Sequence, residues 1–228
     1  MAKKQHKPQP PSSPKNYIRT KGRSLPIGDC YIHKDWQSEG ICNVLVTRKM
    51  PSGKLLIGSY LVDIFCLGVK DTHCFFGIEP SAFEEEVLDK VYRSKEYHKI
   101  SAALAQNIIW GAVEYAEDLG FEPHSSFELT EHLLDPADKI KYIEVEFGKD
   151  GKPYYISGPY DDVDKIITKL TKKLGYDGFT FLATYGDEWD DYGDDEWDDE
   201  DDDEWDDEDD DGPDTAKFGD YIDFEETK

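Results

Sequence analysis

The sequence predicts a single α+β domain over residues 25–183, between a disordered basic arm (1–24) and a disordered acidic tail (184–228). Three observations support this. Segments rich in β-branched and aromatic residues fill the first half of the body, segments with apolar residues at helical spacing follow them, and acids gather at the C-terminus. Without the two polar ends, about 160 residues remain, which is a common size for one domain. We expect two β-hairpins, a central apolar strand and about four helices.

The first hairpin is predicted from residues 41–50 and 55–68, which turn-forming residues 51–54 separate. Its second strand is apolar on both faces and should therefore be central in the sheet. The other expected segments are a turn at 69–72, a strand at 73–78, a second hairpin from 140–147 and 154–157 around a turn at 148–152, and a closing strand at 179–183.

The helices are predicted from apolar spacing and from capping residues. Ser81 and Glu84 have capping-box spacing and should open a helix that ends near residue 93. A second helix should cover 101–119, with Gly120 as its C-terminal cap and an alanine-rich face against the sheet. A short helix begins near Ser126. The fourth helix should cover 163–174. The side opposite its apolar face carries four lysines: Lys165, Lys169, Lys172 and Lys173.

Four cysteines lie on or beside apolar segments: Cys30, Cys42, Cys66 and Cys74. No apolar signal-peptide core follows Met1, so we expect reduced thiols in a cytoplasmic protein. The longest apolar run, 55–68, is too short to span a bilayer, and no membrane segment is expected.

Two kinds of site could be built from these residues. Zinc prefers thiolate and imidazole ligands. Cys30, His33 and Cys66 could supply three of them, and the fourth could be Cys74 or His73. Close cysteine pairs on short turns are lacking, however, which favours ordinary buried thiols.

A thiol-dependent hydrolase would use Cys66 or Cys74 as nucleophile, His73 or His33 as base, and Asp71 or Asp63 to orient the base. Against it, neighbouring strand residues such as His73 and Cys74 point to opposite faces. The chain also lacks a nucleophile elbow, a phosphate-binding glycine loop and a His-Glu-x-x-His motif. We therefore favour a protein without catalytic activity or cofactor, and keep a site near Cys66, Asp71 and His73 as the alternative.

Asp63 lies within the apolar strand, and a buried carboxylate is costly unless it is paired. Its expected partner is Arg48, Lys70 or a main-chain amide. The other interpretation is a polar group that lines a pocket.

The tail contains 20 acids in residues 187–211, and Asp-Glu-Trp-Asp-Asp occurs there three times, so tryptophans recur every eight residues. From residue 187 onward there are 25 acids and two lysines, so the tail holds nearly all of the net charge of −25. Tryptophan rings attract cations, and neighbouring carboxylates add charge. The residues expected to bind are Trp189, Trp197, Trp205, Asp190, Asp198 and Asp206.

We expect the tail to capture a basic partner, namely a ribosomal or other nucleic-acid-binding protein, or a basic groove that holds nucleic acid. Duplex nucleic acid itself should be repelled. Two alternatives stay open: a purely solubilising tail, and an internal contact with the lysines of the 163–174 helix or with the basic arm, whose 24 residues carry seven Lys and Arg and no acid. The arm could equally be a solubilising segment or contact RNA. Residues 217–224 resemble a docking motif, with a frayed end as the alternative.

Several runs of the body resemble a group of uncharacterised bacterial proteins. They are Asn16–Arg19, Leu25–Ile27, Tyr60–Asp63, Cys66–Thr72 and Glu114–His124. The resemblance covers about residues 16–183 and excludes the tail. It implies an α+β body in the bacterial cytoplasm and assigns no activity.

Overall fold

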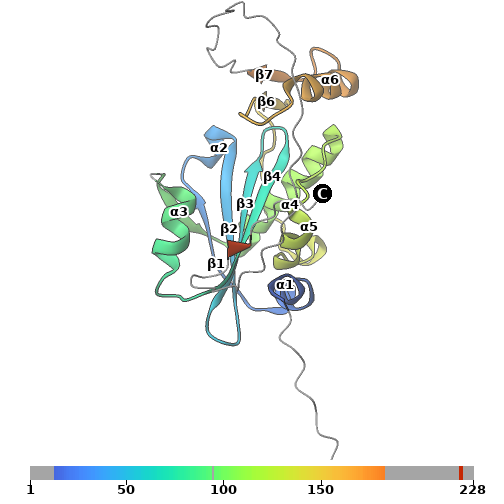
Figure 1. Ribbon diagram of the computed structural model, residues 1–228. Helices are drawn as coiled ribbons and strands as arrows, with labels where there is room; N and C mark the ends of the chain where they lie inside the picture. Colours follow the sequence, from blue (N-terminus) through green and yellow to red (C-terminus); the bar gives the residue numbers. More distant parts are fainter. Residues whose placement is uncertain (1–12, 94, 183–220, 223–228) are drawn as a thin grey trace, which may run out of the picture.

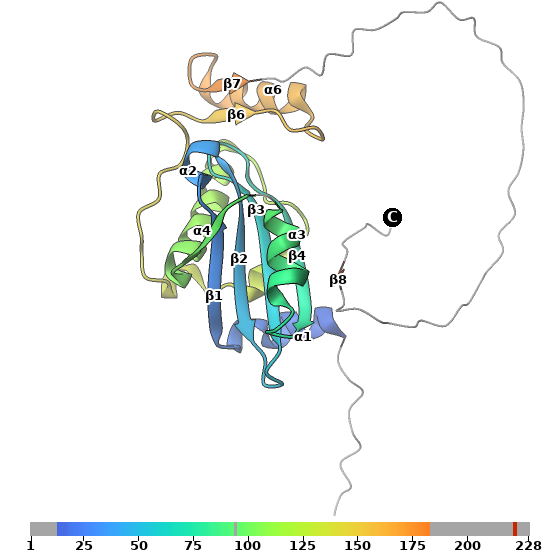
Figure 2. The ribbon, with the colours of Figure 1, turned by 90° about the vertical axis from the view of Figure 1, so that its left-hand side faces the viewer.

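The protein is described from a computed structural model that covers residues 13–93, 95–182 and 221–222 (Figures 1 and 2). As predicted, the fold is α+β. An antiparallel sheet of order β5-β1-β2-β3-β4-β8 carries helices on both faces, and a small unit of two parallel strands and a helix lies at one end (Figure 1). The strands of the main sheet are β1 (Ile27–His33), β2 (Ile41–Lys49), β3 (Leu55–Asp63), β4 (Gly68–Ile78), β5 (Tyr97–Ile100) and β8 (Tyr221–Ile222).

The first predicted hairpin is confirmed, since β2 and β3 pair from Ile41↔Asp63 to Lys49↔Leu55, and β3 is central between β2 and β4. However, β3 ends at Asp63 rather than at residue 68. The turn is formed by residues 64–67, so the expected turn at 69–72 is part of β4 instead. The reason is local: the Asp63 carboxylate accepts hydrogen bonds from the amides of Phe65, Cys66 and Leu67, and these bonds form the turn.

Helices cover both faces of the sheet. The helix α4 (Ala102–Leu119) packs on one face, with its predicted caps in place: Ser101 Oγ accepts from Leu104 N at 3.1 Å, and Gly120 has a φ of 93°. At Gly68, also with positive φ, an added Cβ would lie 2.6 Å from the Cβ of Ala116, so glycine allows the close approach of α4. On the other face lie a π-helical turn, η2 (Glu84–Leu88), and α3 (Asp89–Tyr92) (Figures 1 and 2).

The capping box predicted from Ser81 and Glu84 is not formed. The helical residues begin at Glu84 without a side-chain cap. A main-chain bond from Ala82 N to Glu79 O precedes them, so a backbone turn starts this segment. Two further short helices complete this region of the chain, α2 (Trp36–Glu39) between β1 and β2 and α5 (Phe127–Thr130), which follows Ser126 as predicted.

Part of the expected disordered arm is helical. The helix α1 (Pro14–Lys21), followed by η1 (Gly22–Ser24), begins with Ser13 Oγ accepting from Asn16 N at 3.3 Å. Its Ile18 is fully buried in a cluster with Leu25 and Leu129. Composition alone missed it because few side chains of this basic helix contact the body, among them Ile18 and Tyr17. Residues 1–12 lie outside the described residues.

The second predicted hairpin is wrong. Residues 140–147 form no strand, and β6 (Tyr154–Ile156) pairs in parallel with β7 (Thr180–Leu182) through the crossover helix α6 (Val163–Leu174). The alternating side chains of 140–147 pack on α4 instead, where Phe147 stacks on Tyr115. Strand β5, which pairs with β1, was not predicted. No helix within the described ranges is long and apolar enough to cross a membrane.

Candidate functional site

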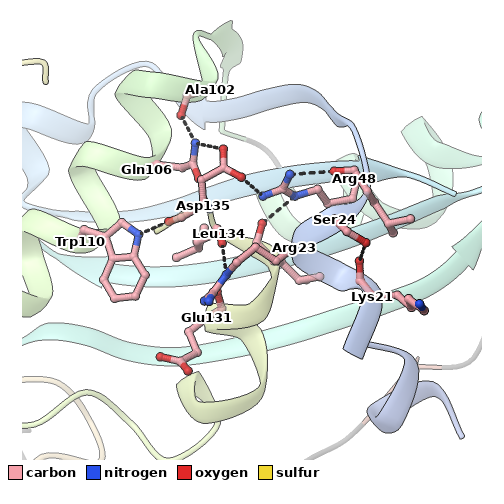
Figure 3. Close-up of polar contacts among 12 residues, drawn as sticks. Lys21, Arg23, Ser24, Arg48, Ala102, Gln106, Trp110, Glu131, Leu134 and Asp135 are labelled. Carbon is pink, nitrogen blue, oxygen red and sulfur yellow. Dashed lines mark hydrogen bonds and ion pairs between the residues drawn. The ribbon is translucent and has the colours of Figure 1, made fainter. Parts of the chain in front are cut away.

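A hollow lies where residues 135–148 cross α4. The start of this crossing is anchored by Asp135 (Figure 3). Its N–H donates to Gln106 Oε1 at 2.6 Å, and its C=O accepts from Trp110 Nε1 at 3.1 Å. Its carboxylate accepts from Arg48 Nη2 at 2.8 Å. Two contacts from α4 and one from β2 therefore hold this residue in place.

Arg48 is 2% exposed and uses two further donors on main-chain oxygens. Nε donates to Leu133 O and Nη1 to Leu25 O, both at 2.8 Å. Arg23 donates in the same way to the oxygens of Leu134 and Glu131. The carbonyls at the end of the 3-10 turn η3 (Glu131–Leu133) are thus satisfied by two arginines, where a helix end would otherwise leave them unpaired (Figure 3).

The far end of the crossing is held by three further contacts. Asn107 Nδ2 donates to Lys141 O at 2.9 Å, and Gly148 N donates to Ile64 O at 2.9 Å. Phe147 lies over Gly111, where a side chain larger than hydrogen would collide with the ring. Between the two anchors, after the 3-10 turn η4 (Ala137–Lys139), the segment 140–146 runs alongside α4 without pairing to a strand.

The resulting groove has a volume of about 400 Å³. We call it the α4 groove. Aromatic and apolar side chains line it, and two carboxylates of α4 join them: Trp110, Tyr115, Tyr142, Ile143, Val145, Phe147, Glu114 and Asp118. Tyr142 is 78% exposed at its rim. Aromatic faces beside carboxylates suit the side chains of lysine and arginine.

This groove was missed by the sequence analysis. A signal was present, because Trp110, Glu114 and Asp118 are four residues apart and so share one face of a helix. The alternation in 140–147 pointed to a strand, and only the packing on α4 shows that it builds a groove wall.

The expected catalytic residues are brought together only in part. Asp71 Oδ2 lies 2.9 Å from His73 Nε2, as their spacing on one strand allows. Cys66 is fully buried in a different, apolar cluster, with Tyr155, Leu170 and other side chains. Burial raises the pKa of the Cys66 thiol, so that the reactive thiolate is disfavoured.

Two residues that the sequence analysis did not select join Asp71. His124 Nδ1 lies 2.7 Å from Ser126 Oγ and 3.5 Å from Asp71 Oδ1. Ser126 is buried, and its hydroxyl also contacts the N–H and the hydroxyl of Thr72. In a catalytic triad, one ring nitrogen of the histidine contacts the serine and the other contacts the carboxylate. Here Nδ1 of His124 contacts both groups, so the three residues do not form a triad. This cluster fastens the start of α5 to β4.

The residues proposed as zinc ligands are distributed over the body. Cys30 and Cys74 are fully buried in separate clusters, and burial raises the pKa of each thiol to about 12. Among the residues described here, no group of three or more His, Cys, Asp and Glu side chains is placed to hold a metal ion. His33 is buried on β1, and its Nε2 lies 3.3 Å from Glu39 Oε2.

Asp63 has one of its expected partners, the main chain. Its oxygens accept from the amides of Phe65, Cys66 and Leu67 at 2.8 to 3.1 Å. Burial raises its pKa to about 6, and the three amides act in the opposite direction. Arg48 and Lys70 pair elsewhere, with Asp135 and Asp161.

The lysines of α6 lie on its exposed side, as predicted, because only Leu170 of this helix is buried. Lys165 pairs with Asp162, and Lys169 lies over the ring of Phe121 at 4.9 Å. Lys172 and Lys173 contact no acid within the described ranges. The tail residues proposed to bind lie outside the described residues, namely Trp189, Trp197, Trp205, Asp190, Asp198 and Asp206.

No family model matches this chain, and comparison with curated proteins and with solved structures also finds no match.

Proposed function

We propose that this is a non-enzymatic binding protein that captures a basic partner, such as a ribosomal or other nucleic-acid-binding protein, through its acidic, tryptophan-containing tail. The observation that carries the proposal is the repeat itself. Three tryptophans, each flanked by acids on both sides, recur every eight residues. A tail that served solubility alone would gain nothing from large aromatic side chains, whereas cation binding uses both ring faces and carboxylates.

The α4 groove supports the same chemistry on the body. Aromatic side chains there meet the carboxylates of Glu114 and Asp118, neither of which has an ion-pair partner among the described residues. We propose that it receives a lysine- or arginine-bearing segment of the same basic partner, because its charge is complementary to such a segment.

The alternative enzyme, a thiol-dependent hydrolase near Cys66, is disfavoured by burial. A nucleophilic thiol needs access to substrate and an accessible thiolate form. Cys66 has neither, since it is enclosed by apolar side chains and burial raises its pKa.

The test is the binding of a fluorescent arginine- and lysine-rich peptide to the full chain, followed by anisotropy at low and high salt. Deleting residues 187–211 should abolish the salt-sensitive complex. Replacing Trp189, Trp197 and Trp205 by alanine should weaken it about tenfold at unchanged net charge, at roughly 0.5 kcal/mol for each cation–ring contact. A tail of the same composition in scrambled order is the control for the spacing.

If the alanine variant bound the peptide as tightly as the wild type, the tail would act through its negative charge alone, and the proposal would be refuted. The contribution of the α4 groove is tested by Glu114→Gln with Asp118→Asn, which should weaken binding about threefold. Glu117→Gln is the matched control, because Glu117 is an exposed acid of the same helix that does not line the groove.

A further inference from the structure

The outer edge of β4, on the side away from β3, is covered over its first residues by a segment other than β8. Val69 O accepts from His124 N at 3.0 Å, and Thr72 N–H donates to Ser126 Oγ at 3.0 Å. Both partners belong to the segment that leads into α5. Main-chain groups of alternate strand residues point to the same edge, and the register with β3 is regular from Thr72 to Phe76. The main-chain groups of Cys74 and Phe76 therefore point outward in the direction of the Thr72 N–H.

This open part of the edge is where the chain returns from its acidic segment. Strand β8 pairs with β4 in antiparallel fashion, with Tyr221 opposite Phe75 and Ile222 opposite Cys74 (Figure 1). Residues 183–220 connect β7 to β8, so the acidic segment is joined to the body at both of its ends.

We propose that the outer edge of β4 beyond Thr72 is a docking site for an extended peptide, and that the C-terminal segment of this chain is its occupant. An open strand edge offers unpaired N–H and C=O groups, which bind an added strand through main-chain hydrogen bonds. The segment suits that role, because tyrosine and isoleucine favour extended structure and acids on either side of them oppose aggregation.

The site has a consequence for the tail. With β8 in place, the chain on both sides of the acidic repeats is attached to the body, and without β8 it is attached on one side. Because the pairing spans two residues in the described part of the segment, docking should be reversible, and the edge should also accept the same segment supplied as a separate peptide. This inference does not rest on the capture of a basic partner.

The test uses hydrogen exchange of the Cys74 amide in the full chain and in Ile222→Pro, since proline cannot donate to the ladder. We expect exchange of Cys74 to accelerate about tenfold in Ile222→Pro and to be unchanged in Thr227→Pro, the matched control. A chain that ends at residue 212 should show the fast exchange. A peptide of residues 215–228 should restore the slow rate, and the same peptide with Ile222→Pro should fail to do so.

Equal exchange of Cys74 in all of these chains would overturn the proposal. So would a shortened chain that dimerises, protects Cys74 and ignores the peptide, because the edge would then dock a second copy. No basic partner is present in these measurements, so their outcome is separate from that of the capture experiment.

Discussion

Arg48 of β2 and Asp135, which follows η3, are 87 residues apart in the sequence, and their side chains meet at 2.8 Å. The same guanidinium binds the main-chain oxygens of Leu25 and Leu133. One buried side chain thereby joins the first strand pair, the segment after α1 and the start of the α4 groove.

Replacing Arg48 by methionine should lower the free energy of unfolding by about 3–5 kcal/mol, because it leaves buried oxygens and the Asp135 carboxylate without a donor. Urea denaturation measures the change. Arg19→Met is the control, since its pair with Glu128 is exposed and should contribute less than about 1 kcal/mol. If Arg48→Met lowered the free energy of unfolding by less than about 1 kcal/mol, the network would not be needed for stability.

Asp63→Asn should destabilise the protein by about 1–3 kcal/mol. An amide group keeps one acceptor oxygen and turns the other position into a donor, which would face one of the three amide donors of the turn. Thermal unfolding compares it with Asp138→Asn, an exposed aspartate whose replacement should be neutral. Equal stability of the two variants would mean that the turn forms without the carboxylate.

His33 should make stability depend on pH. Burial, and then the charge of Lys95, lower its pKa below the usual value, although Glu39 and Asp35 act in the opposite direction. The stability that neutral His33 contributes is therefore complete above about pH 6.5 and is lost as the pH falls through the lower pKa of the folded state.

The measurement for His33 is the difference in unfolding free energy between the wild type and His33→Asn, which removes the titration. This difference should shrink as the pH falls from 7.5 to 5. A difference that widens at low pH would show that the pairing with Glu39 outweighs burial.

The pair of Lys70 and Asp161 should hold the β6-α6-β7 unit to the main sheet. The two side chains meet at 2.8 Å and are 18% and 11% exposed, and Asp161 also accepts from Gly158 N. Burial would raise the pKa of Asp161, but the Lys70 ammonium and the amide hold it below its usual value. Asp161→Asn should destabilise the protein by about 2 kcal/mol, a value between those of buried and exposed pairs.

Hydrogen exchange of β6 and β7 should rise in Asp161→Asn more than exchange of β2 and β3. Asp164→Asn, on the exposed side of α6, is the control. A uniform rise over both regions would argue against a local role of the pair.

All four cysteines should resist alkylation in the native protein and react fully in denaturant. Each is buried, and burial raises the pKa of each thiol. Mass spectrometry after brief treatment with iodoacetamide measures this. Selective modification of native Cys66 would revive the hydrolase alternative.

The sequence predicted the fold class, the β2–β3 hairpin and α4 because each depends on local periodicity and local caps. It missed β5 and α1, which are short and owe their place to partners far along the chain, such as β1 and the cluster around Leu129. The strand predicted from the alternation in 140–147 was wrong for the same reason. The side chains of this segment pack on a face of α4 instead of in a sheet. The α4 groove was missed although part of α4 carried a signal, because its second wall is a segment without strand pairing that contacts α4 through Asp135, Lys141 and Phe147.

The two oppositely charged ends of the chain attach to the same strand. Tyr17 of α1 packs edge-on against Phe76 at 5.5 Å, and β8 pairs with the neighbouring Phe75. The lysines that precede Ser13 and the acids that precede β8 are therefore tethered to neighbouring residues of one strand. If the tail captures a basic partner as proposed, the lysines of the basic arm would compete with that partner for the same acids.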